Sequence, residues 1–376
     1  MKTGIFEMEH FEGAYPVIQL FDMPANQLVI FTDADTYGRF ADLFKEGVHR
    51  FQWEILDPAG GKWRFFRQLY KAAKKHKLDI FYLNTISNNH LFYAWVIGAL
   101  RIARVVITVH DINCLFRSRW SYQFRQLMHH IGKKALIKRV TEYNVVSDTM
   151  IGYLRETTGG QMQIHNVPGA VFESEQHRLT IHEYLHLVVP GSLDKKRRDY
   201  REAFELLKMA EARKLRLHIT LLGGHTDAYG KAIIQRAAAL KTEYATITVY
   251  DTRIVHQDEF DRQLNSAHFI YIPSVINTAI CYAIPETYGL TKSSGNMFDV
   301  IKHARPFIAP QALRISANLE SSCFRYTSIE HLVNFLAGIM QNKTAYKAWE
   351  EQALLNSGEY TIAKVRERNP TLFAMG

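Results

Sequence analysis

The sequence is poor in cysteine, with three in 376 residues, and these three are far apart. An odd number of widely spaced thiols argues against a disulfide framework and against a zinc cluster, and it favours a reducing compartment. No stretch near the first residues combines a basic start with a long apolar core, so we expect no signal peptide. The longest apolar runs are interrupted by charge, as the run from Leu91 to Ile107 is by Arg101 and Arg104, so we expect no membrane span. A cytoplasmic protein is the resulting expectation.

The composition bounds the class of protein and its partners. Hydrophobic residues make up 47% of the chain and charged residues 22%, which is typical of a globular protein and not of a disordered one. A chain of 376 residues is too long for one compact core and suits two domains of ordinary size. The formal net charge of +9 favours anionic partners: nucleotide sugars, phosphorylated lipid or nucleic acid. No recognised nucleic-acid motif accompanies the charge, so we do not expect a nucleic-acid partner.

Short apolar runs alternate with amphipathic segments along the chain. The runs expected as strands, some of which continue into turns, are 28–33, 79–84, 105–109, 143–147, 164–169, 185–192, 217–222, 246–250, 269–273 and 307–309. The expected helices are 37–46, 62–77, 91–102, 148–156, 200–213, 257–266, 329–341 and 345–356. This alternation predicts βαβ units on parallel sheets, and ligands of such sheets bind beyond the carboxyl ends of the strands.

The most informative stretch is 286–310, because small polar residues run there directly into an apolar-periodic segment that begins at Met297. The small polar residues are Ser293, Ser294, Gly295 and Asn296. Free amides, hydroxyl groups and the positive end of a helix dipole would converge at such a point, which suits a phosphate.

Two charged residues flank that helix start, and each has two interpretations. Asp299 lies in the first turn, where it could accept hydrogen bonds from sugar hydroxyls or merely interact with the helix dipole, with Asn296 as the N-cap. Lys292 precedes the turn and could contact a diphosphate or be an exposed surface lysine.

The order of glycine-containing loop, helix with an early acid, basic residue, proline and apolar strand resembles the donor-site signature of GT-B glycosyltransferases. It is most similar to the large retaining family 4, and the resemblance is strongest from about Leu187 to Pro310. In that family a Glu opens the loop, a second acid follows eight positions later, and a Pro comes seven after that. Asp299 and Pro306 match the later positions, whereas Thr291 stands where the first Glu belongs. Glu286 is the nearest upstream carboxylate, so either Glu286 or Thr291 could fill that role.

The resemblance implies an α/β protein of the GT-B fold, with two Rossmann-like domains facing across a cleft. We expect an acceptor-binding domain at 1–172, a nucleotide-sugar domain at 183–345, and a helical segment at 346–376 that packs back on the first domain. The implied reaction moves a sugar from a nucleotide-diphosphate sugar to a glycan or lipid-linked acceptor, with retention, in bacterial polysaccharide or glycolipid assembly. The motif Asp33-Ala34-Asp35 lies in the acceptor half, so we expect no metal requirement and no cofactor.

The implied catalytic residues are His110, Glu286 and Asp299. His110 follows an expected strand, and family 4 enzymes commonly place there a His that reaches the transferred sugar; a turn His beside a helix-capping Asp111 is the alternative. On the acceptor side we expect Asp33, Tyr37 and Asp111, which also lie at strand ends.

The implied donor site draws on two further strand ends. Arg197 and Arg198 belong to the basic run after the turn Gly191-Ser192, and their guanidinium groups suit a diphosphate. The alternative is that this basic run merely faces solvent at the start of a helix. That alternative is disfavoured because cations at a helix start oppose the helix dipole. The pair Gly223-Gly224 could approach the donor or serve only as a turn, and Ile254 is expected to line the nucleobase pocket.

Between Arg117 and Arg139 there are seven basic residues and no acid, interleaved with aromatic residues. This pattern could be a solvated face, or it could dock on an anionic membrane surface at the inner face of the membrane. Two other functions remain open: a non-catalytic sugar-nucleotide-binding protein of polysaccharide assembly, suggested by Thr291, and a sugar-nucleotide epimerase of related fold.

Overall fold

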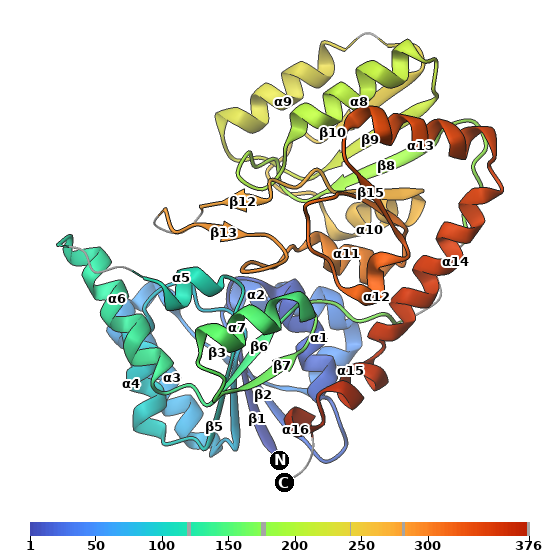
Figure 1. Ribbon diagram of the computed structural model, residues 1–376. Coiled ribbons are helices and arrows are strands. Elements are labelled where there is room, and N and C mark those ends of the chain that lie inside the picture. Colours follow the sequence, from blue (N-terminus) through green and yellow to red (C-terminus); the bar gives the residue numbers. More distant parts are fainter. Residues whose placement is uncertain (119–121, 174–177, 241, 280–282, 374–376) are drawn as a thin grey trace.

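The computed structural model describes residues 1–118, 122–173, 178–240, 242–279 and 283–373 of the chain (Figure 1). They form two α/β domains, stacked one above the other in the view of Figure 1 and joined at one side by the C-terminal helices.

The first domain contains a seven-stranded parallel sheet with strand order β3-β2-β1-β4-β5-β6-β7. Its strands are β1 (Lys2–Phe6), β2 (Gln27–Thr32), β3 (Gln52–Ile55), β4 (Ile80–Leu83), β5 (Arg104–Thr108), β6 (Glu142–Val145) and β7 (Gln163–Asn166). Its helices are α1 (Phe11–Phe21), α2 (Ala34–Phe44), α3 (Lys62–His76), α4 (His90–Leu100), α5 (Ile112–Phe116), α6 (Phe124–Ile137) and α7 (Ile151–Thr157), with short 3₁₀ helices at Lys45–Arg50, Pro58–Gly60 and Asp148–Met150. Successive strand residues such as Ile5 and Phe6 belong to different cores, because side chains alternate between the two faces of the sheet.

The second domain contains a six-stranded parallel sheet with strand order β10-β9-β8-β11-β14-β15. Its strands are β8 (Leu185–Pro190), β9 (Leu217–Leu222), β10 (Ala245–Val249), β11 (Phe269–Tyr271), β14 (Phe307–Pro310) and β15 (Cys323–Tyr326). Its helices are α8 (Tyr200–Ala212), α9 (Ala228–Ala238), α10 (Gln257–Ser266), α11 (Asn296–His303), α12 (Ala317–Glu320) and α13 (Ile329–Gln341). A small antiparallel pair, β12 (Asn277–Thr278) and β13 (Glu286–Thr287), projects from this domain above α5 (Figure 1).

The C-terminal segment runs from the second domain back to the first. It comprises α14 (Ala345–Ser357), a 3₁₀ turn (Gly358–Tyr360), α15 (Ile362–Arg368) and α16 (Pro370–Phe373). Helix α14 packs on α11 and α12, whereas α15 packs on α1. The guanidinium group of Arg366 donates to the backbone carbonyls of Gln19, Leu20 and Asp22, which satisfies the carbonyl groups at the end of α1.

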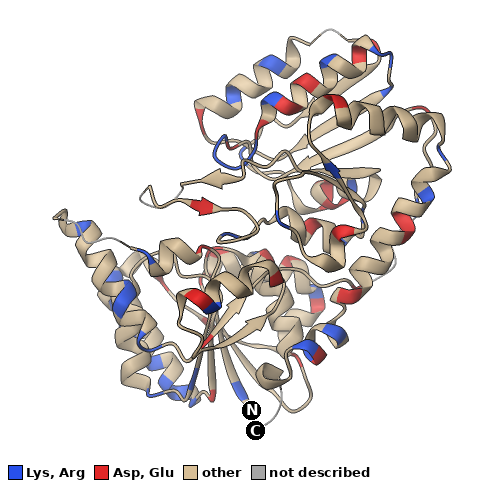
Figure 2. Ribbon diagram, in the orientation of Figure 1, with Lys and Arg blue, Asp and Glu red and all other residues tan. Residues whose placement is uncertain are grey.

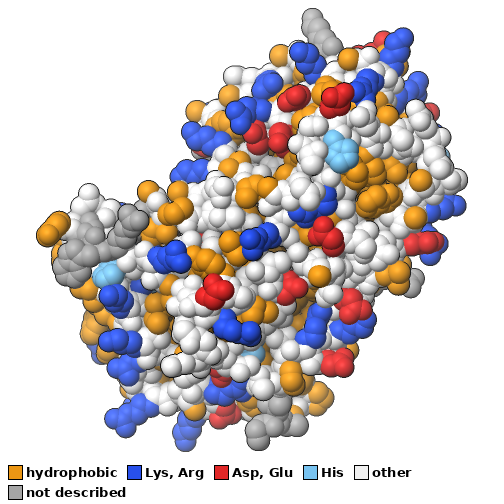
Figure 3. All heavy atoms as spheres, viewed as in Figure 1, with side chains coloured by type: hydrophobic (Ala, Val, Ile, Leu, Met, Phe, Trp, Pro, Cys, Tyr) orange, Lys and Arg blue, Asp and Glu red, His pale blue; other side chains and the backbone are white. Residues whose placement is uncertain are grey.

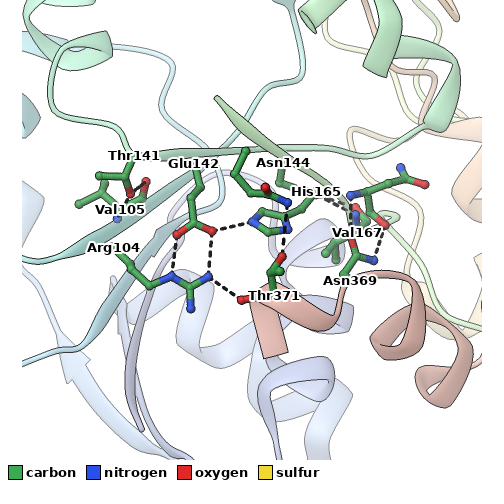
Figure 4. Close-up of polar contacts among 11 residues, drawn as sticks. Arg104, Val105, Thr141, Glu142, Asn144, His165, Val167, Asn369 and Thr371 are labelled. Atoms are coloured by element: carbon green, nitrogen blue, oxygen red, sulfur yellow. Dashed lines mark hydrogen bonds and ion pairs between the residues drawn. The ribbon is translucent and has the colours of Figure 1, made fainter. Parts of the chain in front are cut away.

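Polar contacts fix the last turn of this segment against the first sheet (Figure 4). Arg104 on β5 forms two hydrogen bonds with the carboxylate of Glu142, at 2.6 and 2.8 Å, and also donates to the carbonyl of Thr371. Asn369 exchanges two hydrogen bonds with the backbone of Asn166 on β7. These contacts hold the returning helices in one place on the first domain.

The two parallel sheets flanked by helices confirm the predicted fold class. The sequence reasoning did not identify β1, α1, β3, α9 or β15. In the described part of the chain, no helix has both the length and the apolarity that crossing a bilayer requires.

Candidate functional site

A cavity of about 1210 Å³ lies between the domains, and the loops that follow the carboxyl ends of strands from both sheets form its walls. Fifteen of the residues singled out from the sequence line it: His110, Asp111, Gly191, Ser192, Arg197, Arg198, Gly223, Gly224, Ile254, Lys292, Ser293, Ser294, Gly295, Asn296 and Asp299. Segments far apart in sequence therefore meet at one cleft.

Glycines allow three loops to approach closely on the second-domain side. Gly191 follows β8 with φ 94°, and a Cβ on it would lie 2.2 Å from Nη2 of Arg198. A Cβ on Gly223 would lie 2.2 Å from the carbonyl oxygen of Gly191, and one on Gly224 would lie 2.1 Å from that of Arg253. These two glycines are thus required by backbone packing, beyond any role as a simple turn.

The most informative side chain is Arg198, which is 8% exposed and lines the cleft. Its Nη1 donates to the carbonyl of Ser192 at 3.1 Å, and its Nη2 donates to Oδ1 of Asn296 at 3.3 Å. Its Nε has no hydrogen-bond partner, and none of the described carboxylates forms an ion pair with it. A buried cation whose described hydrogen-bond acceptors are all neutral oxygens is costly unless an anion binds beside it.

The start of α11 lies against this arginine. Asn296 is the first residue of the helix, and its Nδ2 donates to the carbonyl of Pro190 at the end of β8, at 2.9 Å. The cap position belongs to Gly295, so the expectation that Asn296 caps the helix is wrong. The amide of Ser293 donates to the carbonyl of His110 at 3.1 Å and is therefore not available to a ligand.

Lys292 and Asp111 form an ion pair across the cleft, so each is the other's partner in this structure. The Lys292 side chain is 11% exposed and its ammonium lies 5.7 Å from the centre of the Tyr288 ring. It is therefore neither an exposed surface lysine nor a free phosphate ligand. The backbones of the same two residues also form an isolated β-bridge, which joins the two domains.

Asp299 faces the cleft from α11, and burial raises the pKa of its carboxyl to about 7 in spite of the opposing charges of Arg198 and Lys302. Among the described hydrogen bonds, none joins this carboxyl to an amide of its own helix, so the structure gives no support for a capping role. A carboxyl that is close to half protonated near neutral pH can both accept and donate hydrogen bonds to hydroxyl groups.

His110 lies directly after β5, with Nε2 3.2 Å from the carbonyl oxygen of Asn84. Because a carbonyl can only accept, this contact places the ring proton on Nε2 and leaves Nδ1 as an acceptor. Burial, followed by the charge of His10, lowers the pKa of His110, so the ring is neutral near pH 7. The His10 ring is 6.2 Å away, centre to centre.

The loop between β1 and α1 supplies cleft residues that the sequence reasoning missed. The buried carboxylate of Glu7 accepts hydrogen bonds from the amides of Met8 and His10, both at 2.8 Å, and from Nδ2 of Asn84 at 2.7 Å. This network fixes the loop, and His10 and Glu12 line the cleft. Burial raises the pKa of Glu12. The polar cluster directly after Ile5 and Phe6 was the available signal.

Among the described residues, the cleft lining does not include three that were singled out from the sequence: Asp33, Tyr37 and Glu286. Asp33 caps α2 by accepting from the amide of Thr36 at 2.8 Å, and Tyr37 packs edge to face against Trp53. Asp33 and Tyr37 therefore stabilise the first domain, and the acceptor-side prediction is not supported for these two residues.

Glu286 is 2% exposed and lies at the contact between the domains. Its Oε1 accepts from the amide of Cys114 in α5 at 2.6 Å, and burial raises its pKa to about 6. The adjacent contact from Nδ2 of Asn113 to the carbonyl of Pro285 measures 2.9 Å. Glu286 therefore joins β13 to α5, and its catalytic role stays a prediction.

The remaining donor-side residues are more open to solvent. Arg197 pairs with Asp194 at 3.2 Å and its side chain is 48% exposed, while Ile254 is 62% exposed at the edge of the cleft. Within the described ranges, no group of three or more His, Cys, Asp or Glu side chains is arranged to hold a metal ion.

Neither a family model nor a curated protein matches the sequence. Solved structures do match over the full chain. Sucrose-phosphate synthase from Thermosynechococcus elongatus aligns with a TM-score of 0.62 at 12% identity, covering 99% of this chain and 98% of the other. The lipopolysaccharide outer core galactosyltransferase WaaB aligns with a TM-score of 0.58 at 11% identity, covering 100% and 99%. UDP-GlcNAc 2-epimerase from Neisseria meningitidis, bound to UDP-GlcNAc, aligns with a TM-score of 0.56 at 10% identity, covering 99% and 98%.

At these identities the likeness defines the fold. The protein has the GT-B fold, as the resemblance in the sequence implied, and the second domain carries the glycine turns and the buried arginine.

Proposed function

We propose that the protein is a glycosyltransferase that moves a hexosyl unit from a nucleotide-diphosphate sugar to an acceptor hydroxyl, with retention of configuration and without a metal ion or other cofactor. The observation that carries this proposal is Arg198. It is a buried guanidinium without a carboxylate partner, placed between the glycine turn after β8 and the start of α11. A diphosphate supplies the missing negative charge.

In the proposed reaction, the bond from the anomeric carbon to the phosphate oxygen breaks and a bond to the acceptor oxygen forms. The acceptor proton leaves with the nucleoside diphosphate. Arg198 stabilises the charge that develops on the leaving group, and Arg197 assists it from the rim. His110 accepts a hydrogen bond from a hydroxyl of the transferred sugar through Nδ1, and Asp299 binds donor hydroxyls from the opposite wall.

We further propose that the protein acts in the cytoplasm, in polysaccharide or glycolipid assembly, at the surface of an anionic membrane. Basic residues lie along α6 and the helices beside it (Figure 2), and basic and apolar side chains lie side by side along that edge of the molecule (Figure 3). Tyr122 and Phe124 there are 99% and 77% exposed, and Arg117 and Arg125 flank them in the sequence. Exposed aromatic residues with cations favour the interface of an anionic bilayer. Arg119, part of the same basic run, lies outside the described residues.

A non-catalytic sugar-nucleotide-binding protein is the second candidate, because of Thr291. This residue is 3% exposed, and its hydroxyl accepts from the amide of Thr287 at 2.8 Å, so no carboxylate faces the cleft from that position. Such a protein would bind a nucleotide but would neither hydrolyse nor transfer its sugar. A sugar-nucleotide epimerase would instead convert the donor without any acceptor.

The testing experiment is a thermal-shift screen with UDP, GDP, ADP, CMP and their sugar conjugates, with and without Mg²⁺. A ligand that binds only the folded state raises its apparent stability. The proposal predicts a metal-independent shift with one nucleoside diphosphate, which is lost in Arg198→Met and kept in Lys195→Met, an exposed control in the same basic run. The absence of a shift with every nucleotide would contradict the proposal.

A further inference from the structure

The first-domain wall of the cleft contains a second site of uncompensated positive charge, distant in sequence from the donor loops. It consists of the first turn of α4 with the preceding loop, and of Lys133 on α6. Thr85, His90 and Lys133 all line the cleft.

The first turn of α4 has no capping side chain. Asn89 adopts a left-handed conformation with φ 58° at the cap position, and its own side chain makes no capping hydrogen bond. The helix is eleven residues long, so its dipole places partial positive charge at this end. The amide of Phe92 donates to the carbonyl of Asn89 at 2.9 Å, whereas the described hydrogen bonds include none from the amides of His90 and Leu91.

Lys133 adds a full positive charge beside that turn. It is 3% exposed, its ammonium donates to the carbonyl of Cys114 at 2.6 Å, and no described carboxylate forms an ion pair with it. Gly132 explains its position, since a Cβ there would lie 2.8 Å from the amide nitrogen of Leu91 and 3.2 Å from Cβ of His90. Close packing of α6 on α4 thus brings the next residue, Lys133, to the end of the helix where a cation is least stable.

Two polar atoms of residues that line the same cleft are also unsatisfied. Oγ1 of Thr85 and Nδ1 of His90 are buried and have no hydrogen-bond partner, and both residues are less than 7% exposed. Burial and the charge of Lys133 lower the pKa of His90 to about 3, so the imidazole is neutral and can donate through one nitrogen. An ammonium, a hydroxyl, an imidazole and helix amides together form a set of donors suited to the oxygens of one tetrahedral anion.

We propose that the acceptor substrate carries a phosphoryl group that binds between the first turn of α4, Thr85 and Lys133. This phosphoryl site lies in the same cleft as His110. The carbonyl that accepts the hydrogen bond from Lys133 belongs to Cys114, which is four residues beyond His110. That the bound molecule is an acceptor substrate rests on the proposed transferase function. The anion site itself does not depend on that function. The phosphoryl group belongs to a soluble phosphate ester or to a phosphorylated lipid.

The test is phosphate binding by the full chain in an Arg198→Met background, which removes the cation of the donor site. Inorganic phosphate is expected to raise the melting temperature of that protein. Adding Lys133→Met should weaken phosphate binding about tenfold or more, because a charge-assisted contact is lost while side-chain volume is kept. Lys134→Met is the matched control, since Lys134 is the exposed next residue on α6, and it should leave binding unchanged.

Phosphate binding that is absent, or equal in Lys133→Met and Lys134→Met, would overturn the proposal. If Lys133→Met does not unfold cooperatively, Thr85→Val replaces it, and unchanged binding by that isosteric variant would refute the site equally. A Lys133-dependent phosphate shift in a protein that binds no nucleotide would leave the anion site standing and reject the transferase. Glycerol 3-phosphate and a phosphorylated long-chain alcohol in detergent then distinguish a soluble phosphate ester from a phosphorylated lipid. The compound that binds more tightly, with binding that depends on Lys133, identifies the class of acceptor.

Discussion

Replacing Arg198 by Met should separate nucleotide binding from stability. The substitution keeps an unbranched side chain beside Gly191 but removes the buried charge. In the unliganded protein Arg198 gains only two hydrogen bonds to neutral oxygens, at 3.1 and 3.3 Å, against the cost of burying a guanidinium group. We therefore expect the melting temperature of Arg198→Met to equal or exceed that of the wild type.

The loss in binding follows from the number of charged contacts. A hydrogen bond to a charged group contributes about 1.5–3 kcal/mol, so a bidentate contact between Arg198 and a phosphate contributes roughly 3–5 kcal/mol after imperfect geometry. That corresponds to a dissociation constant larger by about 10²-fold to several thousandfold. Arg198→Lys should lose less, about tenfold, because it keeps the charge but not the planar fork.

Isothermal titration calorimetry with the best nucleoside diphosphate measures these affinities, and calorimetric unfolding measures stability. Lys195→Met is the control for net charge. A large fall in the melting temperature with unchanged nucleotide affinity would refute the reasoning, because it would show that Arg198 serves the fold and not an anion.

The remaining predictions concern three other contacts. Asp299→Asn should raise the KM for the donor about tenfold through a lost charged hydrogen bond. The folded state holds the Asp299 proton up to about pH 7 and the unfolded state only to about 3.8, so wild-type stability should fall as pH rises between these values and the variant should lack that fall. An unchanged KM would argue against sugar binding by this carboxyl. Glu286→Ala should loosen the contact with the amide of Cys114, so small-angle X-ray scattering should show a larger radius of gyration while nucleotide affinity stays within about twofold; an unchanged radius would contradict the proposed joining role. Changing Arg117, Arg119 and Arg125 to Glu should abolish salt-sensitive binding to anionic vesicles in a sedimentation assay, and equal binding would reject membrane docking.

Much of the fold could be predicted because parallel strands buried on both faces are short continuous apolar runs. The segments at 80–83 and 217–222 show this directly. The helix α9 was missed because the segment 228–238 has alanine and glycine where a strong apolar stripe would signal a helix. The first strand was missed because Lys2–Phe6 is brief and includes Gly4. A Cβ at this position would lie 2.5 Å from Cδ1 of Leu78.

The candidate site was predictable where one segment carries the signal. Arg198 stands in a basic run before a helix, and the residues 293–296 lie at the start of another, so each could be identified locally. Pairings between distant segments could not be identified in this way. The ion pair between Lys292 and Asp111 and the hydrogen bond from the amide of Cys114 to Glu286 both join the two domains. Sequence spacing carries no information about such contacts.

The central claim is tested most directly by a crystal structure of the protein with the nucleoside diphosphate that gives the largest thermal shift. We expect the β-phosphate within hydrogen-bond distance of the Arg198 guanidinium, at the turn that contains Gly191 and at the start of α11. A diphosphate bound elsewhere in the cleft, with Arg198 still contacting only Ser192 and Asn296, would contradict it.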